Sequence, residues 1–294
     1  MVRQIAPTLA LGFALSVGPV YAQSTPQPPA PSSEESLPVY LRDRGTGVAS
    51  SMFGTYIRKG DLILYPYWEY YLDNNREYKP SELGYGVDQD YRGRYRESEY
   101  LFFVAYGLTD SLAVQTELAA ATASLRKSPT DPSGLSALID ESGLTSFETQ
   151  LRWRWAKESD RRPELWGYVD VVYPINRRKL IIGADGWDIE WGQGFTRGFT
   201  WGTVTARASV FYESASTTHF SAGEYAVEYL KRLSPSWRVF GAIEGSGNEV
   251  SLITEGQWHV SRRMFIRFNQ EIGLTSRAND WEPQLGLLFT LPLR

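Results

Sequence analysis

The chain has 294 residues, 30 basic against 34 acidic side chains, and a formal charge of −4 at pH 7. A mildly acidic chain without basic runs is a poor ligand for nucleic acid, so we expect no nucleic-acid partner. Cysteine is absent, which excludes disulfides, thiolate metal sites and a cysteine nucleophile.

Residues 1–22 have the features of a secretory signal peptide. Arg3 supplies a positive start, residues 9–17 form a short apolar stretch, and Val20-Tyr21-Ala22 is a small-residue cleavage site. The apolar stretch is too short to cross a bilayer as a helix. The sequence therefore predicts a cleavable signal peptide and export.

The next two segments differ in composition. Residues 23–36 are rich in proline and serine, so we expect a disordered tether. Residues 37–60 place apolar islands around a loop of Gly, Asp and Arg residues. Two interpretations stay open for this segment: an N-terminal periplasmic leader into the first strand, or a plug inside a barrel lumen.

From Asp61 onward, apolar and polar residues alternate, and the segment Leu144–Trp155 shows the pattern most clearly. Side chains of an extended strand alternate between two faces. One face of this segment carries Thr145, Phe147, Thr149, Leu151, Trp153 and Trp155. The other face carries Ser146, Glu148, Gln150, Arg152 and Arg154. An apolar face opposite a charged face is typical of a transmembrane β-barrel strand, with lipid outside and water inside.

About twelve such segments follow one another, at 61–71, 95–106, 112–121, 144–155, 164–174, 187–197, 200–212, 222–230, 237–245, 249–259, 264–274 and 281–291. Short turns are predicted at 107–111, 197–199 and 260–263, and long loops at 72–94, 122–143 and 175–186. Bacterial barrels have short periplasmic turns and longer extracellular loops. The sequence therefore predicts an all-β, antiparallel, up-and-down transmembrane barrel of about 12 strands over residues 61–294, in the outer membrane.

A soluble β-sandwich or lipocalin-like barrel also alternates, with its apolar face turned inward. The position of the large aromatic residues favours the membrane barrel. They stand near the ends of the apolar faces, where interfacial belts form; they are Tyr106, Trp153, Trp155, Trp201 and Trp258.

The turn Gly107-Leu-Thr-Asp110 precedes Leu-Ala-Val-Gln-Thr-Glu117, and the chain continues with the strand 144–155, Arg162-Pro-Glu164 and Tyr173-Pro174. In this order the motifs resemble the outer-membrane barrel family labelled putative MetA pathway of phenol degradation. The resemblance covers most of residues 61–291 and implies a transporter-like barrel that takes up hydrophobic or aromatic compounds. It supplies no catalytic residues. One departure is that Phe289 is followed by five further residues, whereas barrel chains usually end at an aromatic residue.

The predicted lumen is the best candidate site. Its inward residues, and candidates for lining a permeation path, are Glu97, Glu99, Glu117, Glu148, Gln150, Arg152, Arg154, Asp170, Glu190, Arg207, Glu228, Arg267 and Glu271. The same phasing turns inward Asp188, Glu224, Arg238, Glu255, Gln257 and Glu282. Acids outnumber bases, so an open pore should prefer cations. A salt-bridged interior that only stabilises the barrel is an equal alternative. Aromatic residues predicted on the inner face are Tyr65, Tyr67, Phe103, Trp166, Tyr168 and Phe240.

Enzymatic sites are weaker candidates. His259-Val-Ser261 has the spacing of outer-membrane lipid A deacylases but lies at the predicted periplasmic end. An omptin-like protease would need His219 and the acids Asp185 and Asp188 to meet at the outer rim. Gly192-Gln-Gly194 and Gly183-Ala-Asp-Gly186 are interpreted as turns or close strand approaches rather than phosphate loops.

Acidic loop residues, at Thr130-Asp131 and Asp140-Glu141, lack a calcium-loop pattern and are interpreted as solvated. We therefore predict no catalytic residues, no cofactor and no metal ligands.

The function expected from these features is passive transport, or a channel, for small solutes, including hydrophobic or aromatic ones. A structural or surface-interaction barrel without transport is the alternative, followed by a barrel enzyme. The expected partners are outer-membrane lipid and lipopolysaccharide, the barrel-assembly machinery and a small-molecule solute.

Overall fold

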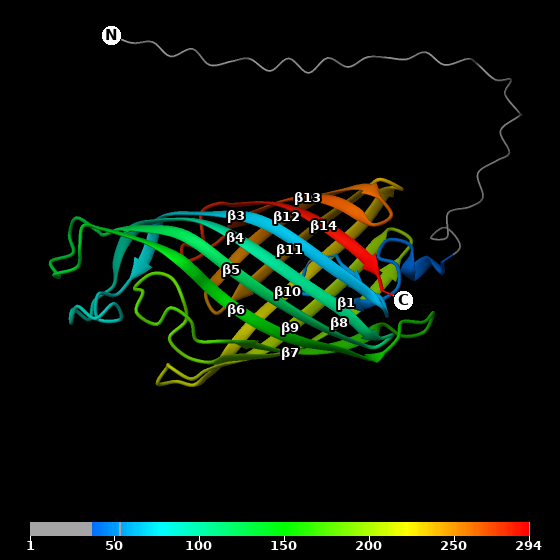
Figure 1. Ribbon diagram of the computed structural model, residues 1–294, viewed down its shortest axis with the longest axis horizontal. Helices are drawn as coiled ribbons and strands as arrows, with labels where there is room; N and C mark the ends of the chain where they lie inside the picture. Colours follow the sequence, from blue (N-terminus) through cyan, green and yellow to red (C-terminus); the bar gives the residue numbers. More distant parts are fainter. Residues whose placement is uncertain (1–36, 53, 294) are drawn as a thin grey trace, which may run out of the picture. The chain divides into compact units, whose positions relative to one another are not determined.

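The computed structural model describes residues 37–52 and 54–293. In these residues twelve antiparallel strands, β3–β14, close a barrel (Figure 1). Each strand pairs with its neighbours in the chain, and β14 pairs with β3 to complete the closure. The twelve-stranded up-and-down barrel predicted from the alternation is confirmed. The predicted signal peptide and tether, residues 1–36, lie outside the described residues.

The barrel strands are β3 (Asp61–Tyr78), β4 (Tyr91–Thr109), β5 (Leu112–Arg126), β6 (Leu138–Ala156), β7 (Glu164–Val172), β8 (Asp188–Phe199), β9 (Gly202–Glu213), β10 (Phe220–Ser234), β11 (Trp237–Ser246), β12 (Glu249–Ser261), β13 (Met264–Gly273) and β14 (Glu282–Pro292). Before them come a 3-10 turn, η1 (Val39–Leu41), and two short paired strands, β1 (Val48–Ala49) and β2 (Tyr56–Ile57). In the part of the chain that the structure describes, no helix combines the length and apolar composition that a bilayer crossing requires.

Four neighbouring strands, β3–β6, are longer than predicted. They have 15 to 19 residues each and extend as a wall beyond the rest of the barrel (Figure 1). The loops predicted at 72–94 and 122–143 therefore shrink to 79–90 and 127–137. The reason is an apolar cluster on the inner face of this wall, formed by Tyr78, Tyr91, Leu125, Leu135 and Ile139. Burial of these apolar side chains keeps the chain extended in stretches whose many polar residues had favoured a loop.

The connections fall into two sets at opposite ends of the barrel. The end that holds the start of β3 and the end of β14 has two-residue turns at 110–111, 200–201, 235–236 and 262–263 and a longer connection at 157–163. The turn predicted at 197–199 belongs to β8 and is displaced to 200–201. The opposite end has connections at 79–90, 127–137, 173–187, 214–219, 247–248 and 274–281. We call these the turn end and the loop end.

The outward face of the barrel is apolar. Leu118, Leu151, Phe268 and Leu285 are among its exposed large side chains. Exposed aromatic residues gather at the turn end (Trp155, Phe199, Trp201, Tyr229, Trp237, Trp258) and nearer the loop end (Tyr100, Phe147, Trp187, Trp191, Phe220, Trp281). On β8, eight residues separate Trp191 from Phe199, which is about 20 Å of height for a strand tilted by about 40°. An outward apolar band between aromatic belts is the reverse of a soluble barrel.

Residue Thr145 departs from the predicted alternation. The register of β5 and β6 shifts between Ala119 and Ala120, where Ser146 and then Leu144 are the partners. This bulge turns the Thr145 hydroxyl to the inner face, where it donates a hydrogen bond to the Glu99 carboxylate. The prediction that Thr145 shares the lipid-facing side of Phe147 is therefore wrong. A β-bulge inserts one residue and reverses the facing of the residues beyond it.

Candidate lumen site

Residues 43–44, 47–50 and 57 of the segment before β3 are buried at the turn end of the barrel. Val48 and Ile57, from β1 and β2, are 1% and 0% exposed. They pack in one apolar cluster with Ile63 and Phe103 of the barrel wall. We call residues 37–52 and 54–60 the inner segment. Its side chains replace the water that would otherwise cover the inner wall here.

Two charged residues connect the inner segment to the wall. Arg44 Nη2 lies 3.0 Å from Glu158 Oε2 and 3.1 Å from Glu164 Oε2, and all three side chains are at most 1% exposed. Asp43 accepts a hydrogen bond of 2.9 Å from the main-chain amide of Arg232. The inner segment is therefore held at two places on the barrel wall, on β7 with its preceding turn and on β10.

Burial and charge act in opposite directions on these groups. Burial alone lowers the pKa of Arg44, but the neighbouring Tyr56, Glu164 and Glu158 outweigh it and raise the pKa above its ordinary value. Burial raises the pKa of Glu158, while hydrogen bonds from the Gly198 amide and from Arg44 oppose that shift. Burial also raises the pKa of Tyr56 to about 12. The arginine is therefore cationic, and the tyrosine a neutral phenol, at neutral pH.

Two glycines of the wall allow the inner segment to approach closely. A Cβ on Gly107 would lie 2.0 Å from the carbonyl oxygen of Arg58, and one on Gly198 equally close to that of Tyr40. No heavier side chain fits at such distances. Gly107 is the first residue of the Gly-Leu-Thr-Asp motif singled out in the sequence. Its structural role is this contact.

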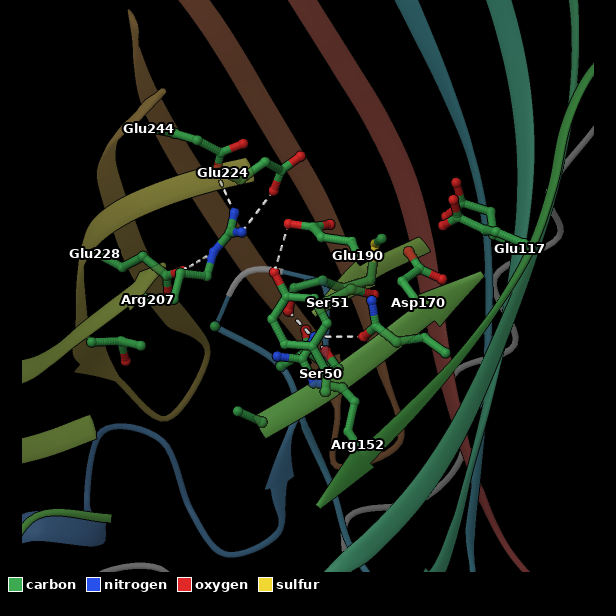
Figure 2. A pocket seen from close by; sticks show the side chains of 18 of the residues that line it. Ser50, Ser51, Glu117, Arg152, Asp170, Glu190, Arg207, Glu224, Glu228 and Glu244 are labelled. Atoms are coloured by element: carbon green, nitrogen blue, oxygen red, sulfur yellow. Dashed lines mark hydrogen bonds and ion pairs between the residues drawn. The ribbon is translucent and has the colours of Figure 1, made fainter. Parts of the chain in front are cut away.

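A cavity of about 420 Å³ lies beside the inner segment, within the barrel (Figure 2). One part of its lining is main chain and side chains of residues 49–52 and 54–56. The strands contribute ten carboxylates and three guanidinium groups. The carboxylates belong to Glu69, Glu117, Glu148, Asp170, Glu190, Glu224, Glu228, Glu244, Glu271 and Glu282. The three arginines are Arg152, Arg207 and Arg267.

Several of these carboxylates oppose one another directly across neighbouring strands. The opposed pairs are Glu117 with Glu148, Asp170 with Glu190, and Glu271 with Glu282. Like charges directly opposite in a sheet destabilise it. Neutral donors reach some of them: the Tyr67 hydroxyl lies 2.7 Å from Glu117 and the Tyr168 hydroxyl 2.9 Å from Glu190. These donors do not cancel the net negative charge of the cavity.

The arginines neutralise the cavity unevenly. Arg207 binds three carboxylates, Glu244 at 2.6 Å, Glu224 at 2.7 Å and Glu228 at 3.3 Å (Figure 2). Arg152 instead lies over the rings of Trp166 and Tyr168, at 4.7 and 4.8 Å from their centroids. The three arginines stand on β6, β9 and β13, and Figure 2 shows Arg207 on one side of the cavity. The opposite side keeps the acids Glu117 and Asp170.

Ten of the thirteen predicted lumen residues line this cavity, and the other three lie elsewhere on the inner face. Glu97 accepts a hydrogen bond from Tyr95, and Glu99 lies 3.5 Å from the Tyr71 hydroxyl, both in the extended wall. Arg154 lies at the turn end, where it donates to the carbonyl of Gly47 and pairs with Glu164.

The wider inward set and the aromatic residues are also placed. Glu224 and Glu282 line the cavity, Glu255 pairs with Arg267 and hydrogen-bonds Gln257, and Asp188 stands opposite Glu213 on β9. Arg238 lies on β11, opposite Gln257. The six predicted inward aromatic residues are all at most 8% exposed.

Glu69 and Glu244 line the cavity but were not predicted. The signal was present, because each stands two residues beyond an inward position, Tyr67 and Ala242.

The two histidines considered for catalysis make packing and loop contacts. His259 packs on Phe265 with ring centroids 4.8 Å apart, and His219 lies in the hairpin loop with Nδ1 3.0 Å from the carbonyl of Glu213.

The prediction that Asp131 is solvated is wrong. The residue is only 5% exposed, and its carboxylate accepts hydrogen bonds from the Tyr78 hydroxyl and the Ser133 amide. The Glu141 carboxylate accepts hydrogen bonds from the main-chain amides of Leu180 and Ile181. No sequence pattern indicated that these two acids form hydrogen bonds that hold the loops.

The Gly-rich sequences have a different role from phosphate binding. Gly192 and Gly194 lie within β8, directly opposite Tyr168 and Trp166. A Cβ on either glycine would overlap the facing aromatic ring. The glycines therefore let two aromatic rings lie flat against the inner wall. In the described residues, no group of three or more acidic or histidine side chains is arranged to hold a metal ion.

Comparison with solved structures finds barrels of the outer membrane. An outer-membrane channel from Pseudomonas putida F1 has a TM-score of 0.59 at 12% identity, covering 83% of this chain and all of that one. The translocator domain of the autotransporter NalP from Neisseria meningitidis follows, at 0.49 and 10%, over 79% of this chain and 88% of that one. At 12% identity, the likeness to the Pseudomonas putida channel extends to the fold alone. No known family and no curated protein matches the sequence.

Proposed function

We propose that this chain is an outer-membrane barrel that admits small solutes and prefers cations. The apolar outer band between two aromatic belts supports membrane residence. The short connections at the turn end support a periplasmic position for that end, with the loop end outside.

The observation that carries the cation preference is the cavity lining. Its ten carboxylates face three guanidinium groups, and all of them lie on the inner wall. Rings of acidic side chains favour cations in channels. Arg207 pairs with Glu224, Glu228 and Glu244, whereas Glu117 and Glu148 stand directly opposite each other as two like charges.

The inner segment occupies the periplasmic part of the lumen in this arrangement. Its ion pairs through Arg44 and its contacts at Gly107 and Gly198 hold it there. We infer that it limits permeation and that solute passage requires its displacement. A buried ion pair is stable only while both charges are in contact, because separating them leaves a buried charge without its partner. The inner segment is therefore expected to be either fully bound or fully displaced.

Aromatic side chains suggest the nature of the solute. Tyr67, Tyr71, Trp166 and Tyr168 share the cavity lining with the carboxylates. Aromatic rings bind other rings and cations. An aromatic amine therefore fits this lining better than an aromatic acid. The motif resemblance to the phenol-degradation family supports uptake of aromatic compounds, and the fold shared with the Pseudomonas putida channel supports a barrel channel in general.

The test is ion current and solute entry through the purified full chain. In planar bilayers under a salt gradient, the reversal potential should show cation preference, and a variant with a displaced inner segment should conduct more. In proteoliposomes, an aromatic amine should enter faster than an aromatic carboxylate of equal size. Anion preference would overturn the cation assignment.

A structural barrel without transport is the second candidate, favoured by the buried inner segment. It predicts no current and no solute entry in the wild type or in the displaced variant. We propose no enzymatic activity, since His219 and His259 belong to packing and loop contacts.

A further inference from the structure

The outer face of β4 changes from apolar to basic towards the loop end. Tyr100 and Phe102 are exposed at 65% and 47% within the apolar band. Beyond Ser98, the same face of the strand continues with Arg96, Arg94 and Arg92, all exposed. A continuous strip on one strand therefore passes from lipid-like surroundings to positive charge.

The strand register brings a third arginine to this place. Arg94 is directly opposite Arg126 on β5, so their Cα atoms are about 5 Å apart. Arg96 is one repeat along the same face, about 7 Å away. Two like charges directly opposite are unfavourable unless an anion bridges them. We call Arg94, Arg96 and Arg126 the arginine triad.

Other basic residues nearby already have partners. Arg92 and Arg277 both pair with Glu77, at 2.8 and 2.7 Å, and Lys127 donates to the carbonyl of Ser133. For the triad, no side-chain hydrogen bond or ion pair exists within residues 37–52 and 54–293. Asp140 of β6 stands opposite Ser124 of β5, and it forms no ion pair with the triad. The triad is therefore a positive surface left open to solvent.

The main chain of the triad lies just beyond the lipid headgroup layer. Arg96 is four residues beyond Tyr100 and Arg94 is six, which is about 10 and 15 Å along the barrel axis at a tilt of about 40°. The headgroup region extends roughly 5–8 Å beyond the hydrocarbon core on each side, and aromatic belts mark the boundary of that core. Arginine side chains are long and extend along apolar surface. Directed towards the membrane, the guanidinium groups of the triad reach the phosphate groups of outer-leaflet lipids.

We propose that the arginine triad binds the phosphate of a glycolipid headgroup in the outer leaflet. Guanidinium groups bind phosphate oxygens in a bidentate manner, and neighbouring guanidinium groups share one phosphate. Binding removes the repulsion between Arg94 and Arg126, and the acyl chains of the same lipid cover Tyr100 and Phe102. This assignment rests on the membrane location and orientation given under the proposed function. It does not depend on transport.

The experiment measures lipid binding to the full chain in detergent. Diphosphorylated lipid A and its dephosphorylated form are titrated, and bound lipid is counted by native mass spectrometry. The wild type should bind the phosphorylated form. Arg94→Gln/Arg96→Gln/Arg126→Gln should bind it at least about tenfold more weakly, since charged hydrogen bonds are lost. Arg161→Gln/Arg262→Gln/Arg263→Gln removes the same charge from exposed residues at the turn end and should bind like the wild type.

Each other outcome overturns the proposal. Equal binding of both lipid forms assigns the contact to acyl chains alone. Equal loss in the two triple variants assigns it to net charge. Displacement of the lipid by inorganic phosphate at matched concentration assigns the surface to a free anion. Heat-dependent gel migration, which reports a closed barrel, verifies folding of every variant. Because no current is measured, failure here is distinct from failure of the channel assignment.

Discussion

The carbonyl oxygen of Tyr40 occupies the space that a side chain on Gly198 would need. A Cβ at Gly198 would lie 2.0 Å from that oxygen. The amide of Gly198 also donates to Glu158 at 2.9 Å, and Glu158 pairs with Arg44 of the inner segment. One glycine of the barrel wall therefore contacts the inner segment directly and through its principal ion pair.

Gly198→Val should displace the inner segment. Overpacking at such a contact costs about 1–3 kcal/mol, and each 1.4 kcal/mol is tenfold in a population. Because the chain has no cysteine, a Ser50→Cys reporter can be added at a position 8% exposed. Its labelling by a maleimide should be about tenfold faster or more in the valine variant. Gly256→Val is the control, because a Cβ there meets nothing within 4 Å. Equal labelling rates in both variants would contradict the contact.

Arg44→Met should destabilise the protein by about 3 kcal/mol, because it leaves buried carboxylates without their main cation. The loss is at the low end for a buried pair, since Arg154 at 3.2 Å from Glu164 and Arg197 at 3.6 Å from Glu158 remain. Urea unfolding in lipid vesicles measures the change. Arg42→Met removes an exposed neighbour and should change stability by less than about 0.5 kcal/mol. Similar values for the two variants would show that the Arg44 pairs do not hold the segment.

Glu148→Gln should stabilise the barrel while weakening cation preference. Glu148 stands directly opposite Glu117, and relief of a like-charge pair is worth about 0.2–1 kcal/mol. The free energy of unfolding should rise, and the reversal potential should move towards zero. Glu249→Gln, an exposed residue of β12, makes the same charge change outside the cavity and should alter neither quantity. A lower free energy of unfolding in Glu148→Gln would contradict the prediction, because it would mean that the charge of Glu148 stabilises the barrel.

The loop 127–137 should loosen in acid. Burial raises the pKa of Asp131, but hydrogen bonds from Ser133 and Tyr78 outweigh it and lower the pKa below its ordinary value of 3.8. A lowered pKa stabilises the folded loop above pH 3.8, and this contribution is lost as the pH falls through the lowered value. Hydrogen exchange of the Ser133 amide, corrected for its intrinsic rate, should accelerate only in strong acid.

Two variants separate this effect from general acid opening. Asp131→Asn should exchange faster already at neutral pH, with no further acid step. Asp140→Asn changes an exposed acid on the neighbouring strand and should behave like the wild type. An acid step of unchanged size in Asp131→Asn would assign it to another group.

Much of the fold was predictable because period-two alternation is local. A side chain such as Glu148 or Leu151 reveals its face from its neighbours alone. The inward position of the thirteen proposed lumen residues follows from that rule, and ten of them line the cavity. The rule failed at Thr145, where a bulge reverses the faces, and in the loops 72–94 and 122–143, where a distant apolar cluster keeps the strands extended.

The sequence by itself determined the strands, their order and the sign of the lumen charge, since each depends on residues close together in the chain. Only the tertiary structure decided where the segment 37–60 lies and which charges meet. Arg44 and Glu158 are 114 residues apart, and Arg94 faces Arg126 only through strand register. Such pairings depend on barrel closure, because bringing distant residues together is a property of the whole sheet and not of any one segment.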